Sequence, residues 1–595
     1  MYVISIKSNS CNGKGMIRVK DHKQIEMFDS WSFLSPKRRR MLDESWPGLF
    51  REHLLCELPV NKVTPFLRDG FGAPSKELYT VLGVLLFQQT MDLSDVQAIE
   101  NLSFNIQWHY ALNITEESDS AKYVSEKTLW NWRQVLIENG LDQVIFDNLS
   151  KKLAKVFNVN ADEQRIDSVH IKSNMRRLGR IGIFSHTIHK FLINLKRHHS
   201  ELFEGICDQL RSRYASNKAL AAFSLTKPSE SAKTLQQVSA DLYELIELFK
   251  GHDAVCAMHS YKLMQRVLAE QCNVQVDADA SKVLVKKPGE IPSNSLQNPS
   301  DPDATYSGHK GQGYQVQVME TFTRTDNEDQ KEQTLNLITS VAVEKACDHD
   351  SQALLPAIAD ARQRQLEPKT LLADTLYGSD DNVAAAKAEH IEVVAPTQKP
   401  GKSDFSRFAF DQNGRVTSCC CGHHPVHVSY KKKTKRYSVR FEFDQCSNCP
   451  HVNDCPVQPG KKNYFLRYSD KDHRLAVRRQ YESTAHFIDL YRWRAGVEAT
   501  MRYYDALTGV KKLRIRGFKS VRYCAVLKAT GLNLFRAAAA NRARRRARQA
   551  QHSGLGPFCL PFPFVKERIY SLLTGLGQIV LPRPRAADYY IEMAA

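Results

Sequence analysis

The chain has 595 residues, of which 42% are hydrophobic and 25% are charged. This length allows three to four domains of roughly 150 residues each, and the composition excludes a wholly disordered chain. The formal net charge is +18. Much of it lies between Arg492 and Arg548, where 16 lysines and arginines stand against two acids, Glu498 and Asp505. Such a segment favours a polyanionic partner, with a solvated basic face as the alternative.

Neither a secretion signal nor a membrane span is visible in the sequence. The N-terminus lacks the combination of basic start, apolar core and small-residue cleavage site, and no run approaches the ~18–20 apolar residues that a span needs. We therefore expect a cytoplasmic protein without a membrane partner. In that compartment the fourteen cysteines are not expected to form a disulfide framework.

Residues 51–156 carry helical patterns after an irregular, polar start over residues 1–50. Apolar residues recur at three- and four-residue intervals, and Ser125 and Gly140 are suited to begin and end one of the helices. Short helices joined by turns are typical of DNA-binding modules, although a helical packing domain is the alternative. We predict a helical DNA-binding module over residues 1–156.

Strand and helix patterns alternate further along the chain, which predicts an α/β fold with a mixed sheet. In chain order the expected elements are strands over 165–172, 313–320 and 335–344, a helix over 351–365, a strand over 369–378, a helix over 380–390 and a strand over 391–396. Helical periodicity after the first strand predicts an insertion over residues 176–297. A basic helix over 486–540 and a basic, flexible tail over 541–595 are expected to end the chain.

Three acidic residues far apart in the sequence stand in segments with distinct patterns. Asp167 lies on the strand RIDSVHIK, Asp374 ends the strand TLLAD, and Glu498 lies on the basic helix. Open α/β sheets place their sites at the carboxyl ends of strands. If the three acids converge, they can hold two Mg²⁺ ions roughly 3.5–4 Å apart for phosphodiester chemistry. Singly, each is more commonly a turn, cap or solvated residue.

Polar side chains share one face of the basic helix. At about 100° per residue, the aligned positions are Tyr491, Arg494, Glu498, Arg502 and Asp505. A carboxylate between two arginines can reach into a site while the guanidinium groups bind phosphate on either side.

These segments together resemble the bacterial insertion-sequence transposases of the DDE class, in the group with a Tyr-x-x-Arg-x-x-x-Glu signature. Tyr491, Arg494 and Glu498 have that spacing. RIDSVHIKSN and LLADTLYGSDDN resemble the strands of the first and second aspartates. KKLRIRGFKSVRYCAVLKATGLNLFRA resembles the family's basic turn and following helix, and the likeness covers roughly residues 60–540.

The resemblance implies a ribonuclease-H-like catalytic domain built from residues 160–175, 298–400 and 481–540. Its catalytic triad would be Asp167, Asp374 and Glu498, binding Mg²⁺ or Mn²⁺. The implied partner is double-stranded DNA, both the terminal inverted repeats and the target, bound by a homodimer in the bacterial cytoplasm at the nucleoid. The expected DNA-contacting residues are Tyr491, Arg494, Arg502, Lys511, Lys512, Arg514 and Arg516. Where the fuller signature has a lysine, seven residues after the glutamate, this chain has Asp505.

Six cysteines fall between Cys419 and Cys455. The spacing Cys446-x-x-Cys449-x₅-Cys455 is typical of zinc ligands, and Cys421, which precedes a glycine, is the expected fourth ligand. This predicts structural Zn²⁺ in a Cys-rich insertion over residues 401–480, beside the basic run KKKTKR. Unligated thiols are the alternative.

Two functions other than transposition fit the same residues. A transposase relic would bind DNA through the basic surface without catalysis, and a metal-dependent nuclease of the same fold would cut without joining. The presence of all three acids argues against the relic.

Overall fold

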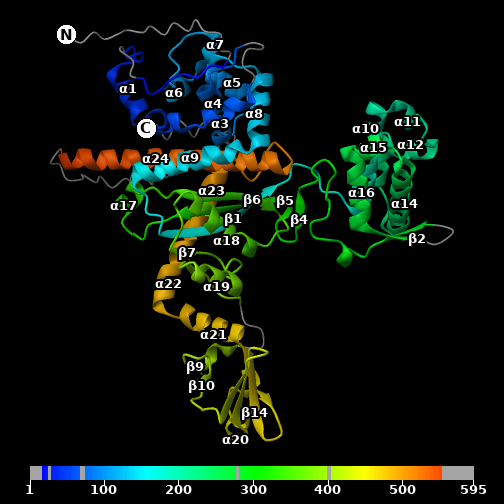
Figure 1. Ribbon diagram of the computed structural model, residues 1–595, viewed down its shortest axis with the longest axis vertical. Helices are drawn as coiled ribbons and strands as arrows, with labels where there is room; N and C mark the ends of the chain where they lie inside the picture. Colours follow the sequence, from blue (N-terminus) through cyan, green and yellow to red (C-terminus); the bar gives the residue numbers. More distant parts are fainter. Residues whose placement is uncertain (1–16, 25–28, 68–73, 277–280, 399–403, 553–595) are drawn as a thin grey trace, which may run out of the picture. The chain divides into compact units, whose positions relative to one another are not determined.

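The computed structural model describes residues 17–24, 29–67, 74–276, 281–398 and 404–552 (Figure 1). The chain divides into two units, Met1–Ala540 and Asn541–Ala595. The elements described below belong to the first unit, apart from the C-terminal end of the last helix.

A six-stranded mixed sheet forms the centre of this unit, as expected for an α/β fold. The strands are β1 (Glu163–Lys172), β4 (Thr305–Ser307), β5 (Gly311–Thr321), β6 (Ile338–Lys345), β7 (Thr370–Leu372) and β8 (Glu392–Val394). β5 is antiparallel to β1, β4 and β6, whereas β1, β7 and β8 run parallel. The order β6–β5–β1–β7–β8 places the strand of Asp167 at the centre, beside the strand that precedes Asp374.

The two faces of the sheet pack against different helices. Alternation along β1 turns Ile166 toward one core, which it shares with α18 (Leu354–Gln363) and α19 (Asp380–Ala388). Val169 faces the opposite core. Asp167 has the parity of Val169, so its side chain lies on that second face, and His170 lies on the other.

Most of the N-terminal helices share the second core with β5, β6 and the last helix, whereas the first of them packs through Leu42 in a separate small cluster with Trp31, Leu34 and Tyr110. The N-terminal helices are α1 (Pro36–Asp43), α2 (Trp46–Leu49), α3 (Val60–Val63), α4 (Leu78–Thr90), α5 (Asp95–Phe104), α6 (Ile106–Ala111), α7 (Asp119–Lys122), α8 (Glu126–Asn139) and α9 (Leu141–Phe157). The predicted cap is confirmed at Ser125, which accepts a hydrogen bond from Thr128 N, and α8 ends at left-handed Gly140. The prediction of an irregular segment over residues 1–50 is wrong where α1 and α2 form. Leu42 of α1 and Trp46 of α2 are buried and hold these helices against the protein.

A bundle with its own hydrophobic core follows β1. Its helices are α10 (Arg180–His198), α11 (Ser200–Glu204), α12 (Asp208–Tyr214), α13 (Asn217–Phe223), α14 (Ser231–Phe249), α15 (Asp253–Cys256) and α16 (His259–Gln271). The insertion is not wholly helical, because β2 (Cys272–Val276) and β3 (Ser281–Val285) pair as an antiparallel hairpin. The β-branched residues of NVQV and KVLV suit strands better than helix.

The Cys-rich segment also has a core of its own, built largely from aromatic side chains. Its strands are β9 (Ala409–Phe410), β10 (Val416–Ser418), β11 (His427–Lys431), β12 (Arg436–Glu442), β13 (Gln458–Pro459) and β14 (Asn463–Ser469), and α20 (Phe443–Ser447) follows β12. The short helix α17 (Glu328–Gln333) lies between β5 and β6 in the chain.

The basic helix predicted over 486–540 is interrupted twice. The elements observed are α21 (Asp470–Glu482), α22 (Ala485–Tyr491), a 3₁₀ turn (Arg492–Ala495), α23 (Gly496–Thr508) and α24 (Phe518–His552). The first break has a tertiary cause, because Arg165 Nη1 donates to the carbonyl of Trp493 at 2.7 Å and engages it outside the helix. The second follows Gly509, which is left-handed at φ 64°.

Helix-forming alanines and arginines continue α24 to His552, where a flexible tail was expected. The rest of that predicted tail, residues 553–595, lies outside the described residues.

Candidate active site

Arg494 links two of the three predicted acids. Its Nη2 donates to Asp167 Oδ2 at 3.2 Å, and its Nη1 donates to Glu498 Oε1 at 3.0 Å. The side chains of Asp167 and Arg494 are each 16% exposed, whereas Glu498 is 66% exposed. Residues from the first strand and from the start of α23 therefore meet at one partly open place.

Burial dominates the ionisation of Asp167. It raises the pKa of this carboxyl, even though the Ser168 N–H donates to Oδ1 at 2.8 Å and Arg494 lies beside it. The charges of Asp374 and Glu498 raise the pKa of Asp167 further. Asp167 and Glu498 thus share Arg494, and Asp374 is near enough to act on Asp167 through its charge.

Asp374 lies two residues beyond the end of β7, rather than at the end of the strand as predicted. Its Oδ1 accepts a hydrogen bond from Leu376 N at 2.8 Å, which fixes the turn. Since β7 runs parallel to β1, both aspartates project from the same sheet.

Tyr491 is the aromatic neighbour of this cluster. Its ring stacks on Phe487 at 5.4 Å. Burial raises the pKa of the Tyr491 hydroxyl, Arg494 opposes the rise, and the charges of Asp374 and Asp167 add to it. The signature residues Tyr491, Arg494 and Glu498 are thus brought together with the two aspartates, despite the break in the helix.

A buried network fixes α23 on the sheet. Glu320 on β5 is fully buried and accepts hydrogen bonds from Arg165 Nε at 2.7 Å, Arg536 Nη1 at 2.8 Å and Thr500 Oγ1 at 2.8 Å. Thr500 lies two residues after Glu498, so the network positions the helix that carries the third acid. The network was not predicted from the sequence, although a glutamate at the end of the strand GYQVQVME was a signal.

The basic turn after α23 presents exposed Lys511, Lys512, Arg514 and Arg516. Asp505 lies beside it, because its Oδ1 accepts from Lys511 N at 3.1 Å and its Oδ2 is 3.8 Å from Lys511 Nζ. Asp505 lies about two helical turns, roughly 10 Å, beyond Glu498. It therefore contacts the basic turn rather than the acid cluster.

Two features bear on whether the acids suit a divalent cation. Carboxylate oxygens are the ligands that Mg²⁺ and Mn²⁺ prefer, and three acids around one guanidinium leave an excess of negative charge. In the described part of the chain, however, no three His, Cys, Asp or Glu side chains are placed to hold an ion, and here Arg494 bridges two of the acids. Its Nε is buried and has no hydrogen-bond partner among the described residues.

The six clustered cysteines are free thiols in this structure. Cys421 Sγ and Cys449 Sγ lie 3.5 Å apart. This distance is too long for a disulfide and close to the ~3.8 Å edge expected for a tetrahedral site with Zn–S bonds of about 2.3 Å. The neighbouring thiols Cys455, Cys419 and Cys449 help burial to raise the pKa of Cys446 to about 11.

Comparison with known families identifies two parts of the chain. Residues 418–538 match the transposase DDE domain, and residues 53–135 match a transposase domain, DUF772. These two matches support an insertion-sequence DDE transposase. The first match includes Glu498 and its helix, whereas Asp167 and Asp374 lie outside both matched ranges.

No curated protein matches this transposase chain. Across the residues that the structure describes, no helix combines the length and apolarity needed to cross a bilayer.

Proposed function

We propose that this transposase cleaves DNA at the terminal inverted repeats of its element and joins the freed end to target DNA. The observation that carries the proposal is the pairing of Asp167 and Glu498 with the same Arg494, with Asp374 near enough for its charge to act on Asp167. The strand order β6–β5–β1–β7–β8, in which β5 alone runs opposite to the other four strands, supports a ribonuclease-H-like catalytic domain.

The chemistry comprises two phosphodiester exchanges. Water attacks the phosphorus at the element's end, the bond to the 3′ oxygen breaks, and that oxygen takes a proton to become a 3′-OH. This hydroxyl then attacks a target phosphorus and displaces the target's own 3′ oxygen. Bound Mg²⁺ or Mn²⁺ would activate each attacking oxygen and stabilise each leaving oxygen.

The side chains of this chain would hold and orient the reactants. Asp167, Asp374 and Glu498 supply the carboxylates for the cations. Arg494 offers its unpartnered Nε–H, and on release from Glu498 also Nη1, to the scissile phosphate. Tyr491 and Arg502 flank it, and Lys511, Lys512, Arg514 and Arg516 contact the backbone further along the duplex. Paired element ends require two such sites, so we infer a homodimer on DNA.

The test is Mg²⁺-dependent processing of terminal-repeat DNA by the wild type, Asp374→Ala and Asp381→Ala. Asp381 is an exposed acid of α19 and serves as the matched control. We expect cutting and joining by the wild type and the control, and neither by Asp374→Ala.

Equal processing by Asp374→Ala and the wild type would overturn the assignment. Cutting without joining by the wild type would point to the nuclease instead, and DNA binding without Mg²⁺-dependent cutting would point to the relic.

The cysteine cluster supports a second, structural proposal, that Cys421, Cys446, Cys449 and Cys455 hold one Zn²⁺ ion. The Cys421–Cys449 separation of 3.5 Å suits such a site. Metal analysis of the purified protein should give one zinc per chain, lost in Cys446→Ser and retained in Cys207→Ser, whose exposed thiol lies in the helical insertion. Equal zinc in both variants would contradict the assignment.

A further inference from the structure

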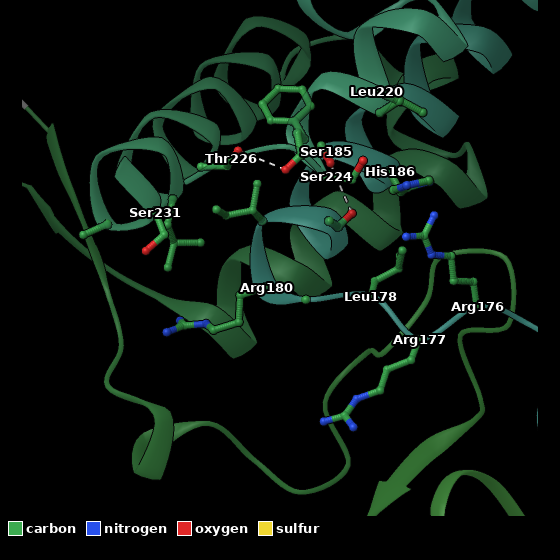
Figure 2. Close-up of a pocket in the computed structure, with 16 residues that line it drawn as sticks. Arg176, Arg177, Leu178, Arg180, Ser185, His186, Leu220, Ser224, Thr226 and Ser231 are labelled. Carbon is green, nitrogen blue, oxygen red and sulfur yellow. Dashed lines mark hydrogen bonds between the residues drawn. The ribbon is translucent and has the colours of Figure 1, made fainter. Parts of the chain in front are cut away.

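The helical insertion contains a basic cavity that the chemistry above does not use. The cavity has a volume of about 630 Å³ and surrounds the first turn of α10 (Figure 2). Its polar lining comprises Arg176, Arg177, Arg180, His186 and four hydroxyl residues, and no aspartate or glutamate lines it. Leu178, Leu220, Phe223 and Leu235 supply an apolar wall.

The guanidinium groups fan out around the start of the helix (Figure 2). Within the described ranges of the chain, none of Arg176, Arg177 and Arg180 forms an ion pair with a carboxylate. Arg177 stacks on Tyr306 at 4.7 Å, and Arg180 Nε donates to Gln271 Oε1 at 3.0 Å. Their positions are therefore fixed by neutral partners, which leave the positive charges uncompensated.

The remaining donors at the cavity come from the backbone. The hydroxyl groups of Ser185, Ser224, Thr226 and Ser231 each donate to a nearby carbonyl. No side chain caps α10, whose N-cap is Gly179, so the amide groups of its first turn are open to a ligand. Amides at a helix N-terminus and neighbouring guanidinium groups are the donors that bind phosphate.

Position connects this cavity with the active site. Arg176 follows the end of β1, the strand of Asp167, by only four residues. Arg516 of the basic turn reaches the same linker, with Nη1 at 3.4 Å from Met175 Sδ. Its charge also helps burial to lower the pKa of Lys190 on α10. Positive charge thus continues from the basic turn onto the insertion.

We propose that the cavity at the start of α10 binds a backbone phosphate of the DNA that the active site processes. This inference rests on the proposed function. It makes the helical insertion a part of the DNA-binding surface, reached from the basic turn, rather than a spacer between two strands of the sheet.

The test compares three variants by their affinity for a short duplex at several salt concentrations. Arg176→Gln/Arg177→Gln removes two exposed charges at the cavity. Lys196→Gln/Arg197→Gln removes two exposed charges near the other end of α10, about 25 Å away along the helix. Ala232→Trp fills the cavity from its exposed rim without a change of charge.

We expect the cavity double variant to lower the slope of log K against log[salt] by about 1, since each lost phosphate contact removes about 0.9. The control pair should keep the wild-type slope, and Ala232→Trp should weaken binding with normal folding by circular dichroism. Equal slopes for the two double variants, or unchanged affinity in Ala232→Trp, would overturn the proposal.

Two further measurements distinguish a DNA phosphate from a free anion as the ligand. They also distinguish failure of this inference from failure of the proposed function. Inorganic phosphate and a mononucleotide are titrated into the wild type, with the melting temperature as readout. Stabilisation that is lost in Arg176→Gln/Arg177→Gln, combined with an unchanged DNA slope, would assign the cavity to a free anion and overturn the DNA assignment. A wild type that binds no DNA contradicts the proposed function itself, whereas wild-type binding with an inert cavity contradicts only this inference.

Discussion

Two clusters of arginine and carboxylate lie on the same face of β1, two residues apart, and differ in charge and in access to solvent. At Arg165 the fully buried Glu320 faces two guanidinium groups, those of Arg165 and Arg536. At Asp167 one guanidinium, that of Arg494, pairs with both Asp167 and the largely exposed Glu498, and the charge of Asp374 also acts on Asp167.

The difference separates a structural role from the catalytic role that we propose. In the buried cluster every oxygen of Glu320 has a donor, so nothing further can bind. In the open cluster the acids outnumber the guanidinium, and bound divalent cations can offset the excess negative charge. The same residue types thus hold a helix in place at one site and remain reactive at the other.

The largest effect that tests this contrast is expected from Glu498→Gln. Loss of one cation ligand should reduce DNA cleavage by about 10³-fold or more, because several kcal/mol of transition-state stabilisation depend on the bound cations. The free energy of unfolding should change by less than about 0.5 kcal/mol, since the side chain is mostly solvated. Cleavage rates and urea denaturation measure the two quantities, and a marked loss of stability would place Glu498 in the structural class.

Glu320→Gln should show the opposite pattern. Two arginines would remain buried without their carboxylate, which costs about 3–5 kcal/mol of unfolding free energy. The control is Glu163→Gln on β1, whose partly exposed ion pair with Arg324 should contribute less than about 1 kcal/mol. If urea denaturation gave equal losses for both variants, the buried cluster would not hold the fold as described.

Gly496→Ala probes the contact between the two clusters. A Cβ at Gly496 would lie 2.0 Å from Arg165 Nη1, whose guanidinium is held by Glu320 and by the Trp493 carbonyl. The guanidinium must therefore shift, at a cost of about 1–3 kcal/mol, and α23 should move with Glu498. Reduced cleavage together with a lower melting temperature is expected.

Gly251→Ala is the matched substitution, because a Cβ there meets no atom within 4 Å. If both glycine variants behaved like the wild type, Arg165 would not transmit position to α23.

The sequence predicted those elements whose pattern is local. Alternating apolar residues located β1, β5 and β6, and signature spacing located Glu498. The hairpin formed by β2 and β3 was missed, because NVQV follows α16 without a glycine or proline to end the helical pattern.

What depends on long-range contacts could not be read from the sequence. Arg492–Ala495 consists of ordinary helix-compatible residues, and their 3₁₀ conformation is explained by Arg165, which lies far away in the chain. Thr500 is likewise ordinary in its own segment, and Glu320 stands out only as an acid at the end of the strand GYQVQVME, with no sign of its partners. Folding alone brings them together, so a buried network of this kind shows no periodicity or spacing that a reader could find.

The smallest expected effect concerns the pH dependence of stability at Asp167. Burial raises the pKa of this carboxyl in the folded protein, so the native state binds its proton more tightly than the unfolded state. The stability contributed by the protonated form is full below the unfolded pKa and is lost as pH rises through the folded pKa.

Asp167→Asn removes this loss. Although inactive, the variant should match the wild type in acid and exceed its unfolding free energy at neutral pH by less than about 1 kcal/mol. Denaturation across that pH range measures the difference. A variant less stable than the wild type at neutral pH would mean that the ion pair with Arg494 outweighs burial, and Asp167 would then belong with Glu320.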